Sequence, residues 1–343
     1  MQHRKHLGVT FSDDMKWTTH VNSICSNAYK KIGLMYRINM YMSIEQMSLY
    51  YKTSIRPIVE YASIIYDNCS KMNEIGLENV QRRAALVCTG AMKRTETSKM
   101  INDLQWESLK VRRHKAKLTA LFKIKKGLVP NYLQELLPNM ITPQERYVFR
   151  HVVKRVDLKT RLNCYKSSFF PSTMDLWIKL SDEESNCNNT KEFKTRLTKN
   201  SLFITYYEKY PKSFLFPYSQ GYYGRILNRI RYGISPLRYH LFTYSITENP
   251  MCPNCHDSVE STKHYFLDCD VYKEHRIQLF TKLCEIHSTF ARLKTDFLET
   301  GNGDYLIMLL LTGSILAGTN NNQIYFAVVQ FLRDTKRFIK INL

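Results

Sequence analysis

Four residues near the C-terminal end constrain this chain more than any other pattern. They read C-x2-C-x8-H-x4-C and comprise Cys252, Cys255, His264 and Cys269. Thiolates and an imidazole at such spacings are typical ligands of a tetrahedral Zn²⁺ ion. Four protein ligands leave no open coordination position, so the pattern predicts a structural metal ion within residues 252–269 and not a catalytic one. The alternative is a chance grouping in a chain of nine cysteines.

The other six cysteines are scattered and form no disulfide framework. This usage is typical of a reducing compartment, so we expect an intracellular protein, nuclear or cytoplasmic. The N-terminus lacks the apolar segment of a signal peptide. The longest apolar run, residues 305–317, is too short to cross a bilayer and predicts a buried helix. We therefore expect no membrane partner.

The charge of the chain is strongly positive and unevenly distributed. It has 50 Lys and Arg against 30 Asp and Glu, a formal net charge of +20. Residues 1–140 carry 22 basic and 11 acidic residues, residues 141–230 carry 16 and 8, and residues 231–343 carry 12 and 11. The excess therefore lies before the predicted metal site, and it suggests a polyanionic partner. The alternative is a generally basic, solvated surface.

Scarce glycine and proline, 12 and 10 in 343 residues, favour helices over turn-rich β structure. Apolar residues at helical spacing, with capping and stop signals, predict a mainly α fold. It would consist of an N-terminal helical bundle, a mixed connector and a C-terminal helical lobe with the CCHC zinc site. We expect helices over residues 17–39, 73–88, 106–126, 192–207, 223–232, 271–287, 305–316 and 324–338. A further helix would start at residue 43 and break near residue 55 because of Pro57, and another would start at residue 235 with Ser235 as its N-cap.

Several of these helices are rich in Lys and Arg. The segment 109–126 alternates an apolar stripe with a dense cationic face, and a second cluster precedes the metal site. Cationic faces of this kind neutralise phosphates, although a solvated helix face explains any single cluster equally well. The predicted nucleic-acid contacts are Arg82, Arg83, Lys110, Arg112, Arg113, Lys117, Arg225, Arg229 and Arg231.

We find no catalytic residues in the sequence. Phe11-Ser12-Asp13-Asp14 is similar to the aspartate turn of polymerases. The residues that follow start a helix, however, and the acids suit the positive end of its dipole. The segment is therefore interpreted as a helix start.

Short motifs recur along nearly the whole chain in a characteristic order. They include Arg56-Pro57 with Glu60-Tyr61-Ala62, Leu104-x-Trp106-x-Ser108-Leu109-x-x-Arg112-Arg113, Ser168-Phe169-Phe170-Pro171, and Arg231-x-Gly233-x-Ser235-x-Leu237-x-x-His240 leading into Cys252. Together they resemble the C-terminal part of a jockey-like non-LTR (LINE-type) retrotransposon reverse transcriptase. The resemblance implies RNA-templated DNA synthesis for the family. Its palm motifs and endonuclease are not found in this chain, so we expect the chain alone to be inactive.

Under this resemblance, residues 1–12 correspond to the end of the palm and 13–137 to a helical thumb-like domain. Residues 138–220 would be the connector, and 221–343 a C-terminal helical domain with zinc at 252–269. The implied function is to bind RNA and DNA, as template–primer or element RNA, without a small-molecule substrate. The alternatives are a non-enzymatic protein-interaction or co-opted zinc-binding module, a residual polymerase or nuclease, and a non-functional truncated element.

Overall fold

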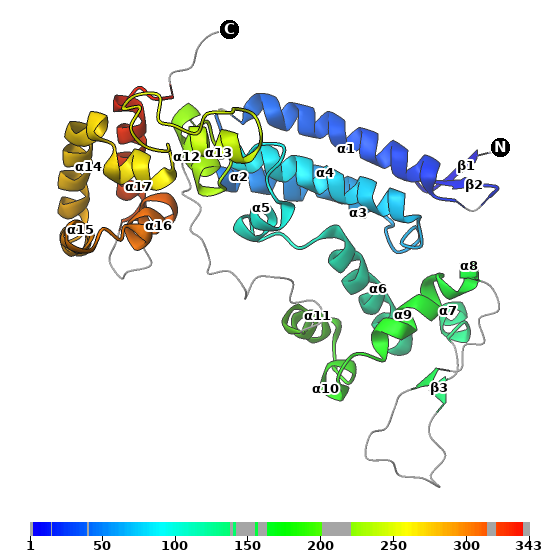
Figure 1. The fold of residues 1–343 in the computed structure, drawn as a ribbon. Coiled ribbons are helices and arrows are strands. Elements are labelled where there is room, and N and C mark those ends of the chain that lie inside the picture. Colours follow the sequence, from blue (N-terminus) through cyan, green and yellow to red (C-terminus); the bar gives the residue numbers. More distant parts are fainter. Residues whose placement is uncertain are drawn as a thin grey trace. The chain divides into compact units, whose positions relative to one another are not determined.

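The structure is a computed structural model that describes residues 3–14, 16–39, 41–137, 140–141, 155–156, 163–200, 221–313 and 320–338. The fold is mainly helical, as the sequence predicted (Figure 1). Within the described residues, no helix combines the length and apolar character that a membrane span needs. Much of the predicted connector lies outside the described residues.

The chain forms two compact units, each assembled from three segments. Residues 1–29, 55–81 and 107–208 make the first unit, and residues 30–54, 82–106 and 209–343 make the second. Helices α1 (Thr18–Ile38) and α4 (Lys71–Thr89) contribute residues to both. These units do not follow chain order, whereas the four domains predicted from the sequence do; that division stays a prediction.

The first unit begins with a β-hairpin. Strands β1 (His3–His6) and β2 (Val9–Ser12) pair antiparallel. Leu7 and Gly8 between them have φ angles of 46° and 83°. Positive φ at both central residues gives a two-residue turn the twist that matches its strands. Further elements of this unit are α3 (Arg56–Glu60), α6 (Leu109–Lys125), α7 (Asn131–Glu135), β3 (Met140–Ile141) paired with β4 (Arg155–Val156), α8 (Asn163–Lys166) and α10 (Asp182–Ser185).

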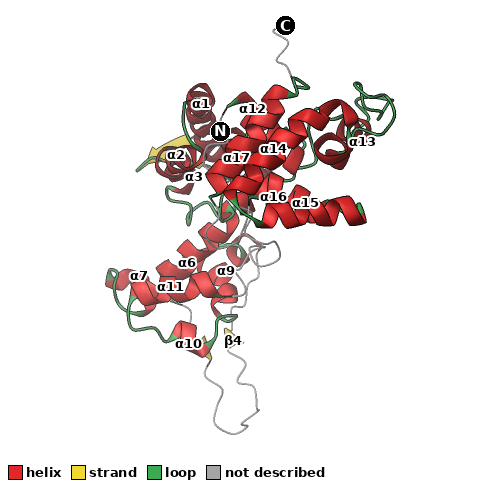
Figure 2. Cartoon of the chain, turned by 90° about the vertical axis from the view of Figure 1, so that its left-hand side faces the viewer, coloured by secondary structure: helices red, strands yellow, loops and turns green. Residues whose placement is uncertain are grey.

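One apolar core of the first unit lies where α6 meets α9 (Phe169–Trp177) and α11 (Thr190–Lys199) (Figure 2). The rings of Phe122 and Phe193 stack with centroids 4.4 Å apart, and Trp177 stacks on Phe193 at 5.7 Å. Large rings buried this way supply much of a small core's stabilisation. The packing of these rings determines which face of α6 contacts α11.

In the second unit, α2 (Ile44–Tyr50) starts at the predicted capping box, because Ser43 accepts from the Gln46 amide and Gln46 accepts from the Ser43 amide. A π-helical turn η1 (Tyr51–Ile55) follows, and α3 then begins with Pro57 in its first turn. The predicted interruption near residue 55 is therefore confirmed, as a widened turn that accommodates the missing amide of proline.

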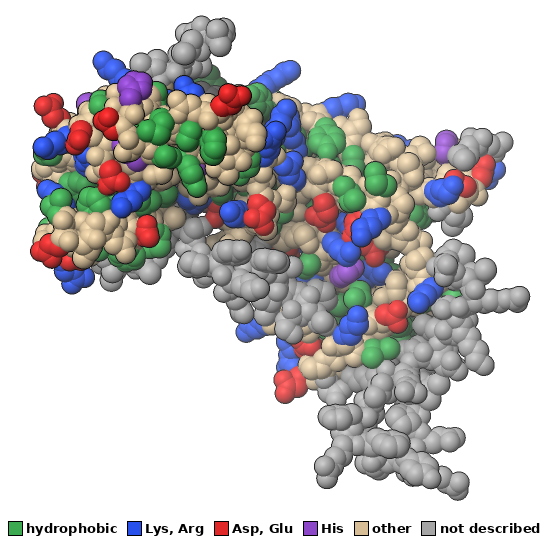
Figure 3. Space-filling model, in the orientation of Figure 1, with side chains coloured by type: hydrophobic (Ala, Val, Ile, Leu, Met, Phe, Trp, Pro, Cys, Tyr) green, Lys and Arg blue, Asp and Glu red, His purple; other side chains and the backbone are tan. Residues whose placement is uncertain are grey.

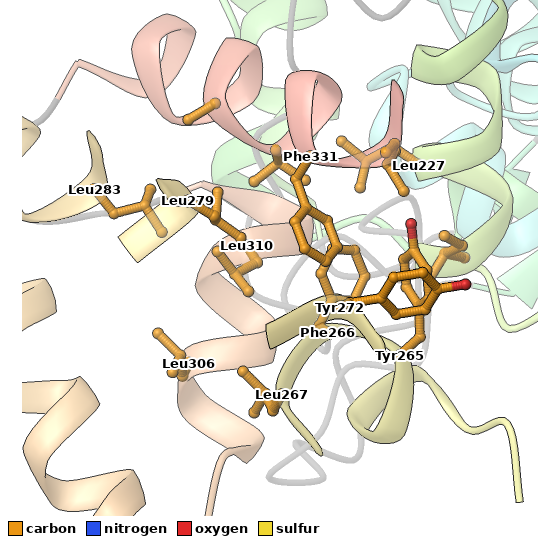
Figure 4. Packing of buried hydrophobic residues seen from close by; sticks show 14 of the residues in the cluster. Leu227, Tyr265, Phe266, Leu267, Tyr272, Leu279, Leu283, Leu306, Leu310 and Phe331 are labelled. Atoms are coloured by element: carbon orange, nitrogen blue, oxygen red, sulfur yellow. The ribbon is translucent and has the colours of Figure 1, made fainter. Parts of the chain in front are cut away.

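The C-terminal part of the second unit has its own apolar core. Its elements are α12 (Tyr222–Arg231), α13 (Arg238–Thr243), a π-helical turn η2 (His264–Asp268), a 3₁₀ turn η3 (Asp270–Tyr272), α14 (Lys273–Ile286), α15 (Thr289–Thr300), α16 (Asp304–Thr312) and α17 (Asn321–Asp334). Figure 4 shows Tyr265 and Phe266 of η2 among side chains of the surrounding helices. Phe266 stacks on Phe331 of α17, with centroids 5.5 Å apart. The core thus holds the segment between His264 and Cys269 in place.

The predicted helices agree with the structure within a few residues in most cases, but one predicted helix start is wrong and several shorter helices were not predicted. The prediction that Ser235 caps a helix is wrong, since α13 starts at Arg238 with Leu237 as N-cap. Ser235 Oγ instead accepts from the Leu237 amide at 3.2 Å, and this local bond competes with helix formation. The helices that were not predicted are α5 (Thr97–Asp103), α7, α8, α9, α10 and α15. The part of the predicted helix 192–207 beyond residue 200 lies outside the described residues.

Candidate metal centre

The first ligand pair lies on a tight turn closed by backbone hydrogen bonds. The Cys252 amide donates to the Ser258 carbonyl at 2.8 Å, and the His256 amide donates to the Cys252 carbonyl at 3.0 Å. His256 has a φ of 61°, which is uncommon for a residue other than glycine. This conformation turns the chain back immediately after Cys255. The two sulfurs are therefore placed on the same side of the turn.

The second pair is positioned by the π-helical turn. The Cys269 amide donates to the His264 carbonyl at 2.8 Å, a hydrogen bond that spans five residues. A spacing of five places two residues on different faces of an α-helix, whereas the wider π turn brings them to one face. At its start, the His264 amide donates to Ser261 Oγ at 3.1 Å. The sequence predicted helical character here, but the widened turn is a tertiary feature.

The four predicted ligands converge. One ligand atom from each of Cys252, Cys255, His264 and Cys269 lies within 4.8 Å of all the others. Cys255 Sγ is 3.3 Å from His264 Nε2. A tetrahedral site with Zn–S bonds of about 2.3 Å has ligand atoms about 3.5–3.8 Å apart, so small side-chain rotations suffice to close the site. Three sulfurs and one nitrogen fit a structural Zn²⁺ ion in number and type.

The surroundings of the sulfurs differ. Cys252 and Cys269 are buried, while Cys255 is partly exposed. Burial raises the pKa of Cys269 to about 12. Burial also raises the pKa of Cys255, but backbone amides of Asp257 and Ser258 that donate to its sulfur outweigh this and hold that pKa below its ordinary value. A metal ion would displace protons from such thiols, so its affinity would rise with pH.

A buried carboxylate anchors the metal turn to the lobe. Glu260 has no exposed surface, and its carboxylate pairs with the guanidinium of Arg337, whose Nη2 lies 2.7 Å from Glu260 Oε2. The same oxygen accepts from the Arg238 amide at 2.7 Å. The turn, the start of α13 and the segment after α17 therefore meet at one side chain. Sequence reasoning missed Glu260, because a single acid between two ligand pairs belongs to no pattern.

His240, at the end of the motif before the metal turn, is also engaged locally. It is buried, and its Nδ1 lies 2.8 Å from Ser235 Oγ. Burial lowers the pKa of His240. The side chain therefore packs as a neutral imidazole and is separate from the four ligands.

Two of the predicted cations on α6 are buried in ion pairs. Arg113 Nε lies 3.1 Å and Lys117 Nζ 2.9 Å from the Asp67 carboxylate. Burial raises the pKa of Asp67, but the charges and hydrogen bond of Lys117 and Arg113 outweigh it and hold that pKa below its ordinary value. Their charges thus already have a buried partner, and phosphate contact by these two side chains stays a prediction.

The other predicted cations of this region differ in exposure. Lys110 is exposed, with its Nζ 3.0 Å from Glu74 Oε1, and Arg112 pairs with Glu60. Arg83 is exposed, and within the described part of the chain it has neither an ion pair nor a hydrogen bond. Among these three, Arg83 is therefore the best placed to meet a ligand from solvent. Arg82, the neighbour of Arg83, donates to the backbone carbonyl of Lys93.

The three arginines of α12 take part in packing within the second unit. Arg229 Nε donates to the Gly90 carbonyl at 3.1 Å, where its charge complements the negative end of α4. Arg231 pairs with Asp103. Arg225 covers Gly90, since a Cβ added there would lie 2.5 Å from Arg225 Cγ. All three are partly buried, and nucleic-acid contact by them stays a prediction.

Basic and acidic side chains are interspersed on the face of the molecule drawn in space-filling form (Figure 3). On the face drawn in Figure 3, Lys and Arg side chains alternate with Asp and Glu and do not gather into one continuous patch. The net charge of the chain therefore does not translate into a single basic surface on this face.

Comparisons with models of known protein families, with curated protein sequences and with solved structures give no match for this chain. The resemblance to a retrotransposon reverse transcriptase thus stays a prediction based on the motifs quoted above.

Proposed function

We propose that this chain is a nucleic-acid-binding protein whose C-terminal lobe is held together by a structural Zn²⁺ ion. The ion would be bound by Cys252, Cys255, His264 and Cys269. The observation that carries the metal part is the convergence of their ligand atoms to within 4.8 Å. Support for the nucleic-acid part is the net charge of +20 and its concentration before the metal lobe.

A structural role suits the donor set better than a catalytic one. Three thiolates and an imidazole fill a tetrahedral coordination sphere, which leaves no position for water or substrate. The ion would join the turn at Cys252 to the π-helical turn at His264. Their side chains contact the same apolar core, so metal binding would couple both turns to the folding of the lobe.

The proposed nucleic-acid contacts are cations that face solvent. Arg83 and Lys110 come from the predicted set, and Lys126 at the end of α6 is exposed as well. Each phosphate neutralised by such a side chain releases a counterion, so affinity falls as salt rises. Within the first unit, Arg113 and Lys117 would support the contacts of Lys110 and Lys126 by holding α6 in place. Within the second unit, Arg231 would hold α12 in place through its pair with Asp103.

The motif resemblance gives this proposal a biological setting. The chain would correspond to the thumb, connector and zinc segment of a jockey-like non-LTR retrotransposon reverse transcriptase, and it would hold template–primer or element RNA. We assign it binding and no catalytic step, because no catalytic residues are identified in it.

Salt-dependent binding tests the proposal. Fluorescence anisotropy of the purified chain with labelled single-stranded RNA and duplex DNA should give affinity that falls with salt, with a slope of log K against log salt of about −0.7 to −0.9 for each phosphate contacted. The double variant Arg83→Gln/Lys126→Gln should bind more weakly and with a shallower slope. Its control, Lys273→Gln/Lys282→Gln, removes two exposed lysines of α14 in the near-neutral lobe. No binding to either nucleic acid, or equal losses in both variants, would refute it.

A protein-binding module is the second candidate, and one observation favours it. Tyr239 and Phe242 of α13 and Ile246 after it are large apolar side chains left exposed beside the metal turn. Exposed apolar side chains that cluster mark interaction surfaces more often than isolated ones do. Binding of nucleic acid that is independent of salt, or absent, would favour this candidate over the first.

A further inference from the structure

A groove lies between α6 and α11 in the first unit, whereas the metal ligands belong to the second unit. It encloses about 470 Å³, within the range of about 300–1,000 Å³ that is common for small-ligand sites. Figure 2 shows the two helices beside each other. The lining of the groove combines four cations and one acid with apolar side chains from both helices.

Helical spacing explains why the groove exists. Ala116, Ala120 and Lys123 follow one another at four and three residues, so they share one face of α6. Lys194 and Thr198 are four residues apart on α11 and form the facing wall. The two helices are held together by the large buried rings described above, whereas the alanines next to them leave space. The groove therefore has an apolar floor with a lysine on either wall.

The charges of the groove are not balanced. It contains four cations and one acid, Glu107. The Glu107 carboxylate pairs with Lys115 and lies 3.5 Å from Arg112 Nη1, so it is already engaged at one end. Lys123 and Lys194 are exposed, and neither has a carboxylate partner among the residues that the structure describes. Two ammonium groups from different helices thus line the same groove, and among the described residues no carboxylate pairs with either.

We propose that this groove binds the phosphate group of a ligand between Lys123 and Lys194. An ammonium group is a strong point-charge donor to phosphate, and two of them from different helices match a phosphate group that presents anionic oxygens in more than one direction. The apolar floor of Ala116, Ala120 and Leu197 contacts the carbon part of the ligand. A free nucleotide and a nucleic-acid strand both present this chemistry. The inference does not depend on the proposed function, because a free nucleotide alone satisfies it.

Titration of the full chain with two probes tests the inference. One probe is a nucleoside monophosphate, with the corresponding nucleoside as its uncharged counterpart, and the other is a short single-stranded oligonucleotide. Binding is followed by calorimetry for the nucleotide and by anisotropy for the oligonucleotide. The test variant is Lys123→Gln/Lys194→Gln. Its control, Lys191→Gln/Lys199→Gln, removes the same charge from exposed positions of α11 that do not line the groove.

We expect the test variant to raise the Kd of at least one phosphate-bearing probe by about tenfold or more, as the loss of two charge-assisted hydrogen bonds implies. The nucleoside should not bind detectably, and the control should stay within about twofold of the wild type for the nucleotide. Ala120→Glu, which puts a negative charge on the groove floor, should weaken binding as well. An effect on the nucleotide identifies a small-ligand site, and an effect on the oligonucleotide alone identifies a strand contact.

Absence of binding by both probes would overturn the inference. It would also be overturned if the test and control variants lost affinity equally, since the effect would then come from net charge and not from the groove. All variants change exposed or partly exposed side chains, and circular dichroism with a melting curve verifies that each is folded. Equal losses in the test and control variants, or loss of nucleotide binding alone, would leave the proposed function standing, because its own test uses Arg83 and Lys126, which do not line the groove. Absence of oligonucleotide binding would count against both proposals.

Discussion

The substitution Cys255→Ser tests the metal centre most directly. Cys255 is the partly exposed ligand, so replacing its sulfur by oxygen leaves no large cavity and removes little apolar burial. Its Sγ is nevertheless 3.3 Å from His264 Nε2 and within 4.8 Å of the other ligand atoms. Any large effect must therefore come from the loss of a metal ligand and not from packing.

The size of the effect follows from the share of one ligand among four. Structural Zn²⁺ sites contribute about 10–16 kcal/mol of apparent binding free energy at neutral pH, so an equal share for one of four ligands is about 2.5–4 kcal/mol. Since about 1.4 kcal/mol corresponds to a factor of ten, zinc affinity should fall by about 10²–10³. A whole domain is stable by only about 5–15 kcal/mol, so the loss should be visible as a lower melting temperature of the lobe.

The assay measures zinc stoichiometry by elemental analysis and thermal unfolding with and without a chelator. Wild type should hold one zinc per chain and melt at a lower temperature after chelation, whereas Cys255→Ser should lose zinc and no longer respond to the chelator. Cys284→Ser is the matched control, because Cys284 lies on α14 in the same lobe, partly exposed and outside the ligand set. Wild type without zinc, or a Cys255→Ser protein with full zinc content and an unchanged melting temperature, would refute the reasoning.

Three other substitutions probe the buried contacts by chemical denaturation. Glu260→Gln should lower the free energy of unfolding by about 3 kcal/mol, because it leaves the Arg337 guanidinium without its buried counter-charge; an unchanged midpoint would contradict the anchoring role. Asp67→Asn should cost about 3 kcal/mol for the same reason at Arg113 and Lys117. The pKa of Asp67 lies below its ordinary value, so the stabilisation by Asp67 is complete above that ordinary pKa and is lost as pH falls through the lower folded value. Asp67→Asn should therefore reduce the dependence of the free energy of unfolding on pH in this acidic range. Gly90→Ala should cost about 2 kcal/mol, since Gly90 has a φ of 66° and its new Cβ would meet Arg225. Equal stability would contradict both the backbone strain and the contact with Arg225.

The helices of this chain could be predicted because their signals are local. Gly90 and Gly127 end α4 and α6 with positive φ, and Ser43 and Gln46 cap α2, all within a few residues of the signal itself. The metal ligands were also predictable, since the spacing of Cys252, Cys255, His264 and Cys269 is a property of the sequence. Their convergence agrees with that pattern.

Tertiary structure determines whether each charged side chain forms a buried ion pair or faces solvent. Periodicity placed Arg113 and Lys117 on a helix, but only folding brings Asp67, some fifty residues earlier in the chain, within hydrogen-bond distance of both. Glu260 and Arg337, 77 residues apart, meet in the same way. A run of cations in a sequence carries no information about distant acids, so it cannot distinguish a surface for phosphate from a buried ion pair. The spacing was sufficient to identify the metal ligands because all four lie within residues 252–269, whereas the charge pattern depended on acids brought from distant parts of the chain.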